Sequence, residues 1–316
     1  MMPILARTRL GLAAARRGLP SPVVLVPTMG ALHQGHRALI RRAREAATAD
    51  GSVVVSIFVN PLQFGAGEDF DRYPRTLDSD AMICAEEDAD LIFAPDRDQV
   101  YPQQQLITVD PGPMGQGLEG ESRPGHFAGV LTVVLKLFRL TAADAAVFGE
   151  KDAQQLALVC RMAQDLDLGI EIIGVPTVRD PDGLAISSRN RFLSGPQRRT
   201  ALLLPAALRA GREAAHAGPA AVLKAAGEVL STAADPPLLL DYLTLVDPAT
   251  FEQVGEDCSG QARLVVAARV GATRLIDNTP LPLGGVDGSA GGGAGSGAGS
   301  GAGSGADGGA DFGAGN

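Results

Sequence analysis

The sequence predicts an α/β protein, in which a doubly wound parallel sheet with helices on both faces is followed by a smaller C-terminal α+β lid. Two observations support this fold class. Short apolar segments rich in β-branched residues, such as residues 23–26, alternate with longer segments of helical periodicity, which is typical of a parallel sheet. After about residue 180 this alternation stops, and two helical patterns are followed by strand patterns.

The order of the patterns along the chain gives the individual elements. Strands of the parallel sheet are predicted at residues 23–26, 52–60, 90–95, 145–148 and 172–178. Helices are predicted at residues 37–49, 76–87, 127–140 and 152–166. The later part predicts helices at residues 194–216 and 220–233, a strand at residues 239–247, and a hairpin formed by residues 263–270 and 273–277. We therefore expect a ligand-binding domain at residues 1–180 and a lid domain at residues 181–283.

Composition argues against several classes of protein. The net charge of −9 disfavours a protein that binds nucleic acid through a basic surface. The sequence has no apolar run of about eighteen residues, the length that favours a membrane span. The three cysteines, Cys84, Cys160 and Cys258, are scattered and odd in number, which fits a reducing, cytoplasmic location without disulfides.

Residues 284–316 differ in composition from the rest of the chain. They consist mainly of Gly, Ala and Ser and contain no Lys or Arg. Such a segment cannot bury enough apolar surface to offset the entropy that is lost on ordering. We therefore expect a disordered, low-complexity tail that is dispensable for function.

The turn at residues 27–36, between the first predicted strand and the following helix, carries the most informative local pattern. A helix start offers backbone N–H groups and the positive end of the helix dipole, which suit a phosphate. His33 and His36 are three residues apart, so they share one helix face and can reach the same anion. A lone histidine would more often be structural, and a zinc site would need further ligands, for which the chain offers only His126 and His216. A phosphate site is the better interpretation.

Polar clusters also follow three other predicted strands. They are Asn60 to Gln63, Gly149 to Asp152, and Ile186 to Asn190. The carboxyl ends of parallel strands lie at one edge of a sheet, and ligands of open α/β sheets bind there. The sequence therefore predicts that these clusters and the histidine turn converge on one crevice.

The chain resembles the pantothenate synthetase (pantoate–β-alanine ligase) family of nucleotidyl transferases over about residues 5–283. The segments that carry the resemblance are PTMGALHQGH at 27–36, SIFVNPLQF at 56–64, RYPR at 72–75, RPGHF at 123–127, FGEKD at 148–152 with Gln155, and SSRNR at 187–191. Each motif is moderately specific, and all of them in this order are highly specific. The resemblance implies a Rossmann-like fold and condensation of (R)-pantoate with β-alanine through a pantoyl adenylate. ATP and Mg²⁺ would be required, and the products would be pantothenate, AMP and diphosphate. The resemblance also implies a homodimer with small-molecule substrates.

The resemblance implies a role for each matched residue. His36 is expected to donate a proton, His33 to contact an ATP phosphate, and Lys151 to steady the pentacoordinate phosphorus. Arg189, with Ser187 and Ser188, would hold the leaving diphosphate. Gln63 would bind pantoate and β-alanine, Gln155 would bind pantoate, and Asn60 belongs to the same substrate site. The remaining expected ATP contacts are Met29, Gly30, Ala31, Leu32, Gln34, Gly35, Gly149, Glu150, Asp152, Val178 and Ile186.

Some residues keep two interpretations open. Asp152 fits either ribose hydroxyls or the start of a helix. The apolar residues Phe58, Val133 and Phe148 suit either the walls of the binding site or an ordinary core. Ser79 stands where relatives carry an Asp near the metal, which leaves Asp80 as a possible outer-sphere partner of Mg²⁺. The protein ligands of the metal, if any, are unknown from the sequence.

Two other functions compete with the ligase. One is a nucleotidyl transferase that acts on a phosphorylated acceptor, and the other is a non-catalytic nucleotide-binding protein. The Gln63 and Gln155 amides favour a carboxylate acceptor over a phosphorylated one. The complete set of His, Lys and Arg side chains argues against a non-catalytic protein.

Overall fold

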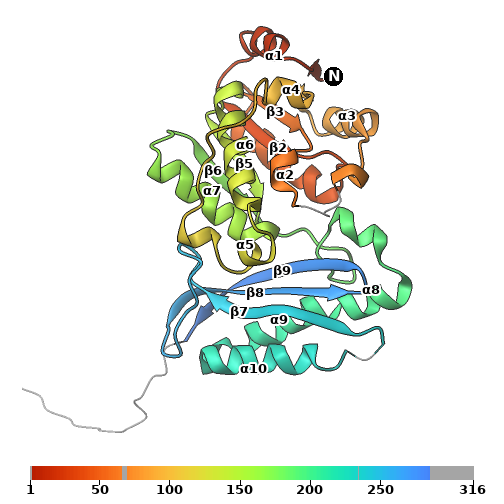
Figure 1. Cartoon of the computed structure of the whole chain (residues 1–316), viewed down its shortest axis with the longest axis vertical. Coiled ribbons are helices and arrows are strands. Elements are labelled where there is room, and N and C mark those ends of the chain that lie inside the picture. Colours follow the sequence, from red (N-terminus) through yellow and green to blue (C-terminus); the bar gives the residue numbers. More distant parts are fainter. Residues whose placement is uncertain (1, 66–69, 234, 285–316) are drawn as a thin grey trace, which may run out of the picture. The chain divides into compact units, whose positions relative to one another are not determined.

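A six-stranded parallel sheet forms the centre of the larger half of the molecule (Figure 1). The computed structural model describes residues 2–65, 70–233 and 235–284, so the predicted tail lies outside the described residues except for Gly284. The strand order is β1 (Ile4–Ala6), β4 (Leu91–Phe93), β3 (Ser52–Ile57), β2 (Val23–Thr28), β5 (Ala145–Gly149) and β6 (Glu171–Val175). Every neighbouring pair is parallel, which confirms the predicted fold class.

The direction of winding reverses between β2 and β5. From β2 the chain adds β3 and β4 on one side, and it then crosses back to place β5 and β6 on the other side. The loops that leave β2 and β5 therefore turn to opposite faces of the sheet and open a crevice between the carboxyl ends of these two strands. This crevice receives the histidine turn from β2 and the Gly149 to Asp152 segment from β5.

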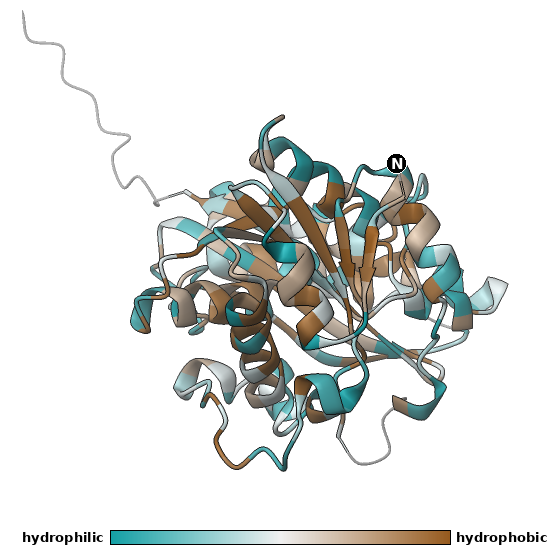
Figure 2. Ribbon diagram, turned by 90° about the horizontal axis from the view of Figure 1, so that it is seen from above, coloured by the Kyte–Doolittle hydropathy of each residue, from teal (hydrophilic) through white to brown (hydrophobic). Residues whose placement is uncertain are grey.

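Helices cover both faces of this sheet because its central strands are apolar on both sides. Leu25 packs with α1 (Arg9–Arg16), α6 (His126–Thr141) and α7 (Ala153–Asp165). Val24 and Val26 face α2 (Gln34–Ala47) and α3 (Leu77–Glu86). Figure 2 shows apolar strands enclosed by helices that carry both polar and apolar residues. Alternate residues of one strand thus enter two separate cores, as expected for a buried parallel strand.

The smaller half is an antiparallel sheet with helices on one face. Its strands are β7 (Leu238–Val246), β8 (Gly260–Val270) and β9 (Thr273–Leu283), in that order. The helices α8 (Gly195–Ala201), α9 (Leu203–Glu213) and α10 (Pro219–Leu230) share a core with one face of this sheet (Figure 1). On the opposite face, Val265 and Phe251 pack against Ala153 at the start of α7. The sheet therefore lies between its own helices and the parallel-sheet half.

The structure corrects the boundaries of several predicted elements. The strands predicted at residues 52–60 and 172–178 end at Ile57 and Val175. The helix predicted at residues 194–216 is two helices that meet at Leu202, because Pro205 has no N–H to continue the hydrogen bonds of α8. The hairpin is longer than predicted, since β9 runs on through Pro280 and Pro282. Proline is tolerated there because β9 is an edge strand.

Several short elements have no counterpart in the prediction. They are β1, α1, α4 (Arg97–Val100) and α5 (Glu119–Ser122). Each is short, between three and eight residues, so its periodicity is too weak to recognise. Among the described residues, no helix has the length and apolar character needed to cross a membrane.

Candidate active site

Two adjoining cavities lie at the carboxyl ends of the parallel strands. One, of about 250 Å³, is lined by residues from β2, α2, α6 and β5, and the other, of about 570 Å³, extends toward β8 and β9. The residues that line both are Tyr73, Arg123, His126, Lys151, Asp152, Gln155, Ser187, Ser188 and Arg189. The predicted polar clusters thus meet at one place, as the strand order requires.

Most of the predicted site residues line these cavities. They are Met29, His33, Gly35, His36, Gln63, Gly149, Lys151, Asp152, Gln155, Val178, Ile186, Ser187, Ser188 and Arg189. Within the described part of the chain, six others fall outside the lining: Gly30, Ala31, Leu32, Gln34, Asn60 and Glu150. The ligand contacts predicted for these six residues stay predictions.

The histidine turn is held by hydrogen bonds between its backbone and its own side chains. His33 is the N-cap of α2, and its Nδ1 accepts the N–H of Gly35 at 3.2 Å. His36 Nδ1 accepts the N–H of His33 at 3.2 Å, and the two ring centroids are 4.0 Å apart. Because each Nδ1 is an acceptor, the proton of each neutral ring resides on Nε2. Each imidazole therefore offers one N–H donor on its outer edge.

Both imidazoles are uncharged at neutral pH. Burial, reinforced by the positive charge of Lys151, lowers the pKa of His33 to about 4. Burial and the neighbouring His33 lower the pKa of His36 to about 3. In the ligand-free protein the pair can therefore bind an anion by hydrogen bonds, without first carrying a full positive charge.

Asn60 lies behind Gln63 and orients it. Asn60 is 1% exposed, and its Nδ2 donates to Gln63 Oε1 at 3.2 Å and to the Gly129 carbonyl at 3.1 Å. Tyr101 donates its hydroxyl to Asn60 Oδ1 at 2.9 Å. Gln63 Nε2 in turn donates to Met29 Sδ at 2.8 Å. Asn60 therefore supports the Gln63 amide, and its predicted contact with substrate stays a prediction.

Gly129 permits this arrangement. A Cβ atom at Gly129 would lie 2.0 Å from the carbonyl oxygen of Leu62, so only glycine allows α6 to approach the 3₁₀ turn Pro61–Gln63 this closely. The sequence gives no sign of this contact, because it joins residues far apart in the chain.

Lys151 stands in the 3₁₀ turn Glu150–Asp152, which links β5 to α7. Glu150 was expected at ATP, yet its carboxylate pairs with Arg263 of β8 at 3.2 Å. Asp152 occupies the N-cap position of α7, where its side chain forms no capping hydrogen bond with any described residue. Asp152 therefore stands at the start of a helix, as predicted, although its side chain does not cap it, and the ligand interpretation stays a prediction.

The segment of Ser187 to Arg189 is tied both to its own loop and to β9. Ser187 Oγ accepts the N–H of Arg189 at 3.2 Å, and Ile186 donates its N–H to the Val178 carbonyl at 2.9 Å. At the base of this loop, Arg179 forms two hydrogen bonds with Asp277 of β9, at 2.6 and 2.9 Å. The position of Arg189 thus depends on the smaller sheet.

Several residues that line the cavities received no role from the sequence. His126 Nδ1 lies 2.8 Å from the Gln63 carbonyl, and Arg123 Nη1 lies 3.0 Å from His126 Nε2. The RPGHF and RYPR segments were recognised as family motifs, which was the available signal. Asn278 and Arg274 of β9 also line the larger cavity, and no sequence pattern identified them.

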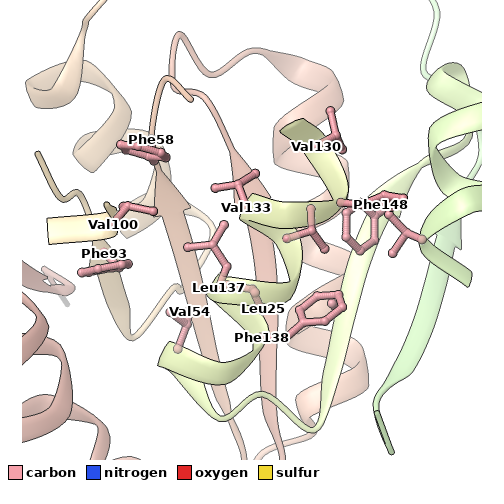
Figure 3. Close-up of a cluster of buried hydrophobic side chains, with 14 of the residues drawn as sticks. Leu25, Val54, Phe58, Phe93, Val100, Val130, Val133, Leu137, Phe138 and Phe148 are labelled. Carbon is pink, nitrogen blue, oxygen red and sulfur yellow. The ribbon is translucent and has the colours of Figure 1, made fainter. Parts of the chain in front are cut away.

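The apolar side chains of the site serve as core and as wall. Phe58, Val133 and Phe148 are each at most 6% exposed and belong to the core beneath β2 and α6 (Figure 3). The same three residues line the smaller cavity. Both interpretations left open by the sequence are therefore correct.

The described residues contain no group of three or more His, Cys, Asp and Glu side chains that could hold a metal ion. Both carboxylate oxygens of Asp80 accept backbone N–H groups, from Leu32 at 2.8 Å and from Ala31 at 3.0 Å. Because both oxygens of Asp80 already accept hydrogen bonds from the backbone of the histidine turn, this carboxylate is poorly suited to bind a metal ion.

Comparison with known proteins gives consistent matches. A family model described as "Pantoate-beta-alanine ligase" matches residues 5–280. The pantothenate synthetase of Thermobifida fusca is 60% identical over 289 residues, which cover 89% of this chain and 96% of that protein. The pantothenate synthetase of Mycolicibacterium smegmatis is 52% identical over 288 residues, with 90% and 88% covered.

Solved structures agree with these matches. The crystal structure of pantothenate synthetase from Thermus thermophilus has a TM-score of 0.80 at 46% identity and covers 87% of this chain and 98% of that one. A pantoate-beta-alanine ligase from Francisella tularensis, complexed with "Beta-gamma ATP" and beta-alanine, has a TM-score of 0.71 at 34% identity, with 88% and 97% covered. The likeness therefore extends over both sheets.

Proposed function

The chain belongs to the pantoate-beta-alanine ligase family, and from that premise we propose that it condenses pantoate with β-alanine, using ATP, to give pantothenate, AMP and diphosphate. One observation carries the proposal: His33, His36 and Lys151 line the same cavity as the amides of Gln63 and Gln155. Donors suited to a triphosphate thus stand beside neutral groups suited to a carboxylate and hydroxyls.

In the first step, a carboxylate oxygen of pantoate attacks the α-phosphorus of ATP. The new O–P bond forms while the bond to the bridging oxygen breaks, and diphosphate leaves with the bonding electron pair. His33 and His36 donate their Nε2–H groups, and Lys151 its ammonium, to the oxygens on which charge develops. Arg189, Ser187 and Ser188 hold the departing diphosphate.

In the second step, the amine of β-alanine attacks the acyl carbon of the pantoyl adenylate. The C–N bond forms, the C–O bond to AMP breaks, and the amine loses a proton. The acyl group is already activated, so no nucleophilic Ser or Cys is needed. The protein contributes orientation and exclusion of water. Gln63 and Gln155 hold pantoate, and residues 181–283 act as a lid over residues 1–180.

Mg²⁺ enters this proposal as the counter-ion of the ATP phosphates, whose charge it would reduce. The absence of a carboxylate cluster among the described residues, together with the backbone contacts of Asp80, does not fit an ion held by protein carboxylates. We therefore propose no protein ligand for the metal and no step that depends on one.

The proposal extends to the setting of the enzyme. By family membership, the protein acts as a homodimer in the cytoplasm on small-molecule substrates, without nucleic acid or membrane. Sedimentation of the purified full-length chain tests the dimer, and a single species with the mass of one chain would contradict it.

The adenylate mechanism is tested by isotope exchange. In the absence of β-alanine, the protein should transfer label from diphosphate into ATP, and only when pantoate is present. This exchange requires a reversible first step with free diphosphate as product. If the folded protein forms no labelled ATP in the presence of pantoate, the mechanism is overturned. Formation of labelled ATP without pantoate would favour a different acceptor.

A further inference from the structure

We propose that Asp80 is a positioning residue for this reaction, because its buried carboxylate holds the backbone turn that presents the histidine pair. Asp80 lies on α3, outside the lining of both cavities. The inference rests on the function proposed above, but it concerns a residue to which that function assigns no role.

The contacts of Asp80 are directed at the turn. Its side chain is buried, at 1% exposure. Oδ2 accepts the N–H of Ala31 at 3.0 Å, and Oδ1 accepts the N–H of Leu32 at 2.8 Å. The Thr76 hydroxyl donates to the same carboxylate at 3.2 and 3.3 Å. The carboxylate therefore holds the turn at two successive backbone N–H groups.

This turn needs such support. Gly30 has φ +83° and Ala31 has φ +51°, so two successive residues adopt the left-handed conformation. That conformation is strained for alanine, which carries a Cβ, but not for glycine. A Cβ at Gly30 would lie 3.0 Å from Asp80 Oδ2, so the carboxylate packs directly against the turn. Without it, Ala31 could relax, and His33 two residues later would move.

A second contact fixes α3 to the helix that carries the histidines. Glu87, at the end of α3, accepts hydrogen bonds from Arg37 at 2.7 Å and from Arg41 at 2.6 and 2.7 Å. Arg37 and Arg41 lie on α2, one and five residues after His36. Asp80 and Glu87 therefore anchor the histidine pair from both sides, through the turn before it and the helix after it.

The test is Asp80→Asn, with Asp78→Asn as the matched control. The new side-chain amide would place its N–H₂ group against one of the two backbone N–H donors, whereas Asp78 is exposed on the same helix and undergoes the same change of charge. We expect Asp80→Asn to lower kcat for diphosphate exchange by about tenfold or more, because misplaced donors lose transition-state contacts. KM for pantoate should change less than about threefold, because Gln63 and Gln155 hold pantoate. Asp78→Asn should match the wild type.

A purely structural role is separated from a positioning role by rescue. Ala31→Gly removes the strain of the left-handed conformation, so in the Asp80→Asn background it should restore kcat by about threefold or more. If Asp80→Asn fails to fold, Ala31→Val places a β-branched residue in the same turn with Asp80 intact, and it should lower kcat similarly. A wild-type kcat in Asp80→Asn or Ala31→Val, or no rescue by glycine, would overturn the proposal.

A readout that does not require activity separates this inference from the proposed function. The ¹⁵N chemical shifts of the imidazoles report which ring nitrogen carries the proton. Asp80→Asn should disturb the Nε2–H form of His33 and His36, whereas Asp78→Asn should not. Lack of exchange in the wild type would defeat the proposed function alone, and unaltered imidazole shifts in Asp80→Asn would defeat the inference.

Discussion

The side-chain amide of Asn278 donates a hydrogen bond of 3.0 Å to the main-chain carbonyl of Lys151, so a residue of the antiparallel sheet holds the loop at the end of β5. The same Nδ2 donates to the Glu150 carbonyl at 2.9 Å. Arg263 completes the contact with its ion pair to the Glu150 carboxylate. The backbone that carries Lys151 therefore depends on the docked position of β8 and β9.

We expect Asn278→Ala to lower kcat for diphosphate exchange by about tenfold, because two carbonyls of the Lys151 loop lose their donor. Stability should also fall by about 1–3 kcal/mol, measured by urea unfolding, since two partly buried acceptors are left unsatisfied. Thr279→Ala, the next residue on the strand, is the control and should leave kcat unchanged. Equal rates for the two variants would contradict the role given to Asn278.

The Nε2–H of His36 is expected to contribute directly to the first step. His36→Ala should reduce the rate of diphosphate exchange by about 10²-fold or more, because a donor to the developing charge is lost. His216→Ala serves as a control, since His216 lies in the 3₁₀ turn after α9 and is not among the residues that line either cavity. A His36→Ala variant that exchanges at nearly the wild-type rate would remove His36 from the catalytic set.

The lowered pKa values of the two histidines predict a loss of stability in acid. The folded pKa values, about 4 for His33 and about 3 for His36, lie below the ordinary value of 6.5, so the unfolded chain binds protons that the folded chain excludes. The free energy of unfolding is therefore unaffected by these two rings above pH 6.5. It falls as the pH drops from 6.5 toward 4 for His33 and toward 3 for His36, by at most about 1.4 kcal/mol per pH unit for each ring.

His36→Gln removes one of these two titrations. Its unfolding free energy should therefore decline less steeply than that of the wild type between pH 6.5 and pH 4. Chemical denaturation at a series of pH values gives both curves, and parallel curves would show that His36 is not kept uncharged by the fold.

A largely buried ion pair, with side chains 15% and 12% exposed, attaches the smaller sheet to the parallel-sheet half. Arg274 donates to both carboxylate oxygens of Glu119 at 2.8 and 2.7 Å, and the Tyr242 hydroxyl donates to the same carboxylate at 2.8 Å. Arg274→Met would leave the carboxylate without its charged partner, so we expect a loss of about 3–5 kcal/mol in the free energy of unfolding.

The control for Arg274→Met is Arg269→Met. Arg269 is half exposed and pairs with Asp241 at 3.7 Å, so its loss should cost less than about 1 kcal/mol. Both variants change an arginine of the same sheet to the same residue, and chemical denaturation compares them directly. If both variants lose a similar amount of unfolding free energy, the Arg274–Glu119 pair contributes no more to stability than an exposed pair.

Deletion of residues 284–316 should leave turnover and stability unchanged. Every residue assigned to the site lies before residue 279, and the family match ends at residue 280. Steady-state kinetics of the shortened and full-length chains provide the comparison. A large fall in kcat or a large change in KM on deletion would refute the prediction that this segment is dispensable.

The sequence predicted the parallel sheet and most of the site because both depend on local patterns. Apolar β-branched runs mark buried strands, and the polar clusters that follow them mark the carboxyl edge of the sheet. The order of the strands brings the segments that carry His33, Gln63, Lys151 and Arg189 to the same edge of the sheet, where these residues line one pair of cavities. Short elements such as β1 were not predicted, since three residues carry too little periodicity to recognise.

Contacts between residues far apart in the chain were decided by the tertiary structure. Asn60 and Glu150 carry the right chemistry to bind a ligand, yet packing directs the first to Gln63 and the second to Arg263. Asp80 is a similar case. The sequence left it as a possible outer-sphere partner of Mg²⁺, and in the structure its carboxylate accepts two backbone N–H groups of the histidine turn. The sequence by itself therefore determined the fold class, the family and the edge of the sheet where the chemistry lies. Tertiary structure alone decided which polar groups face the cavity and which support it, because a hydrogen-bonding group acts on whatever partner the packing brings within about 3 Å.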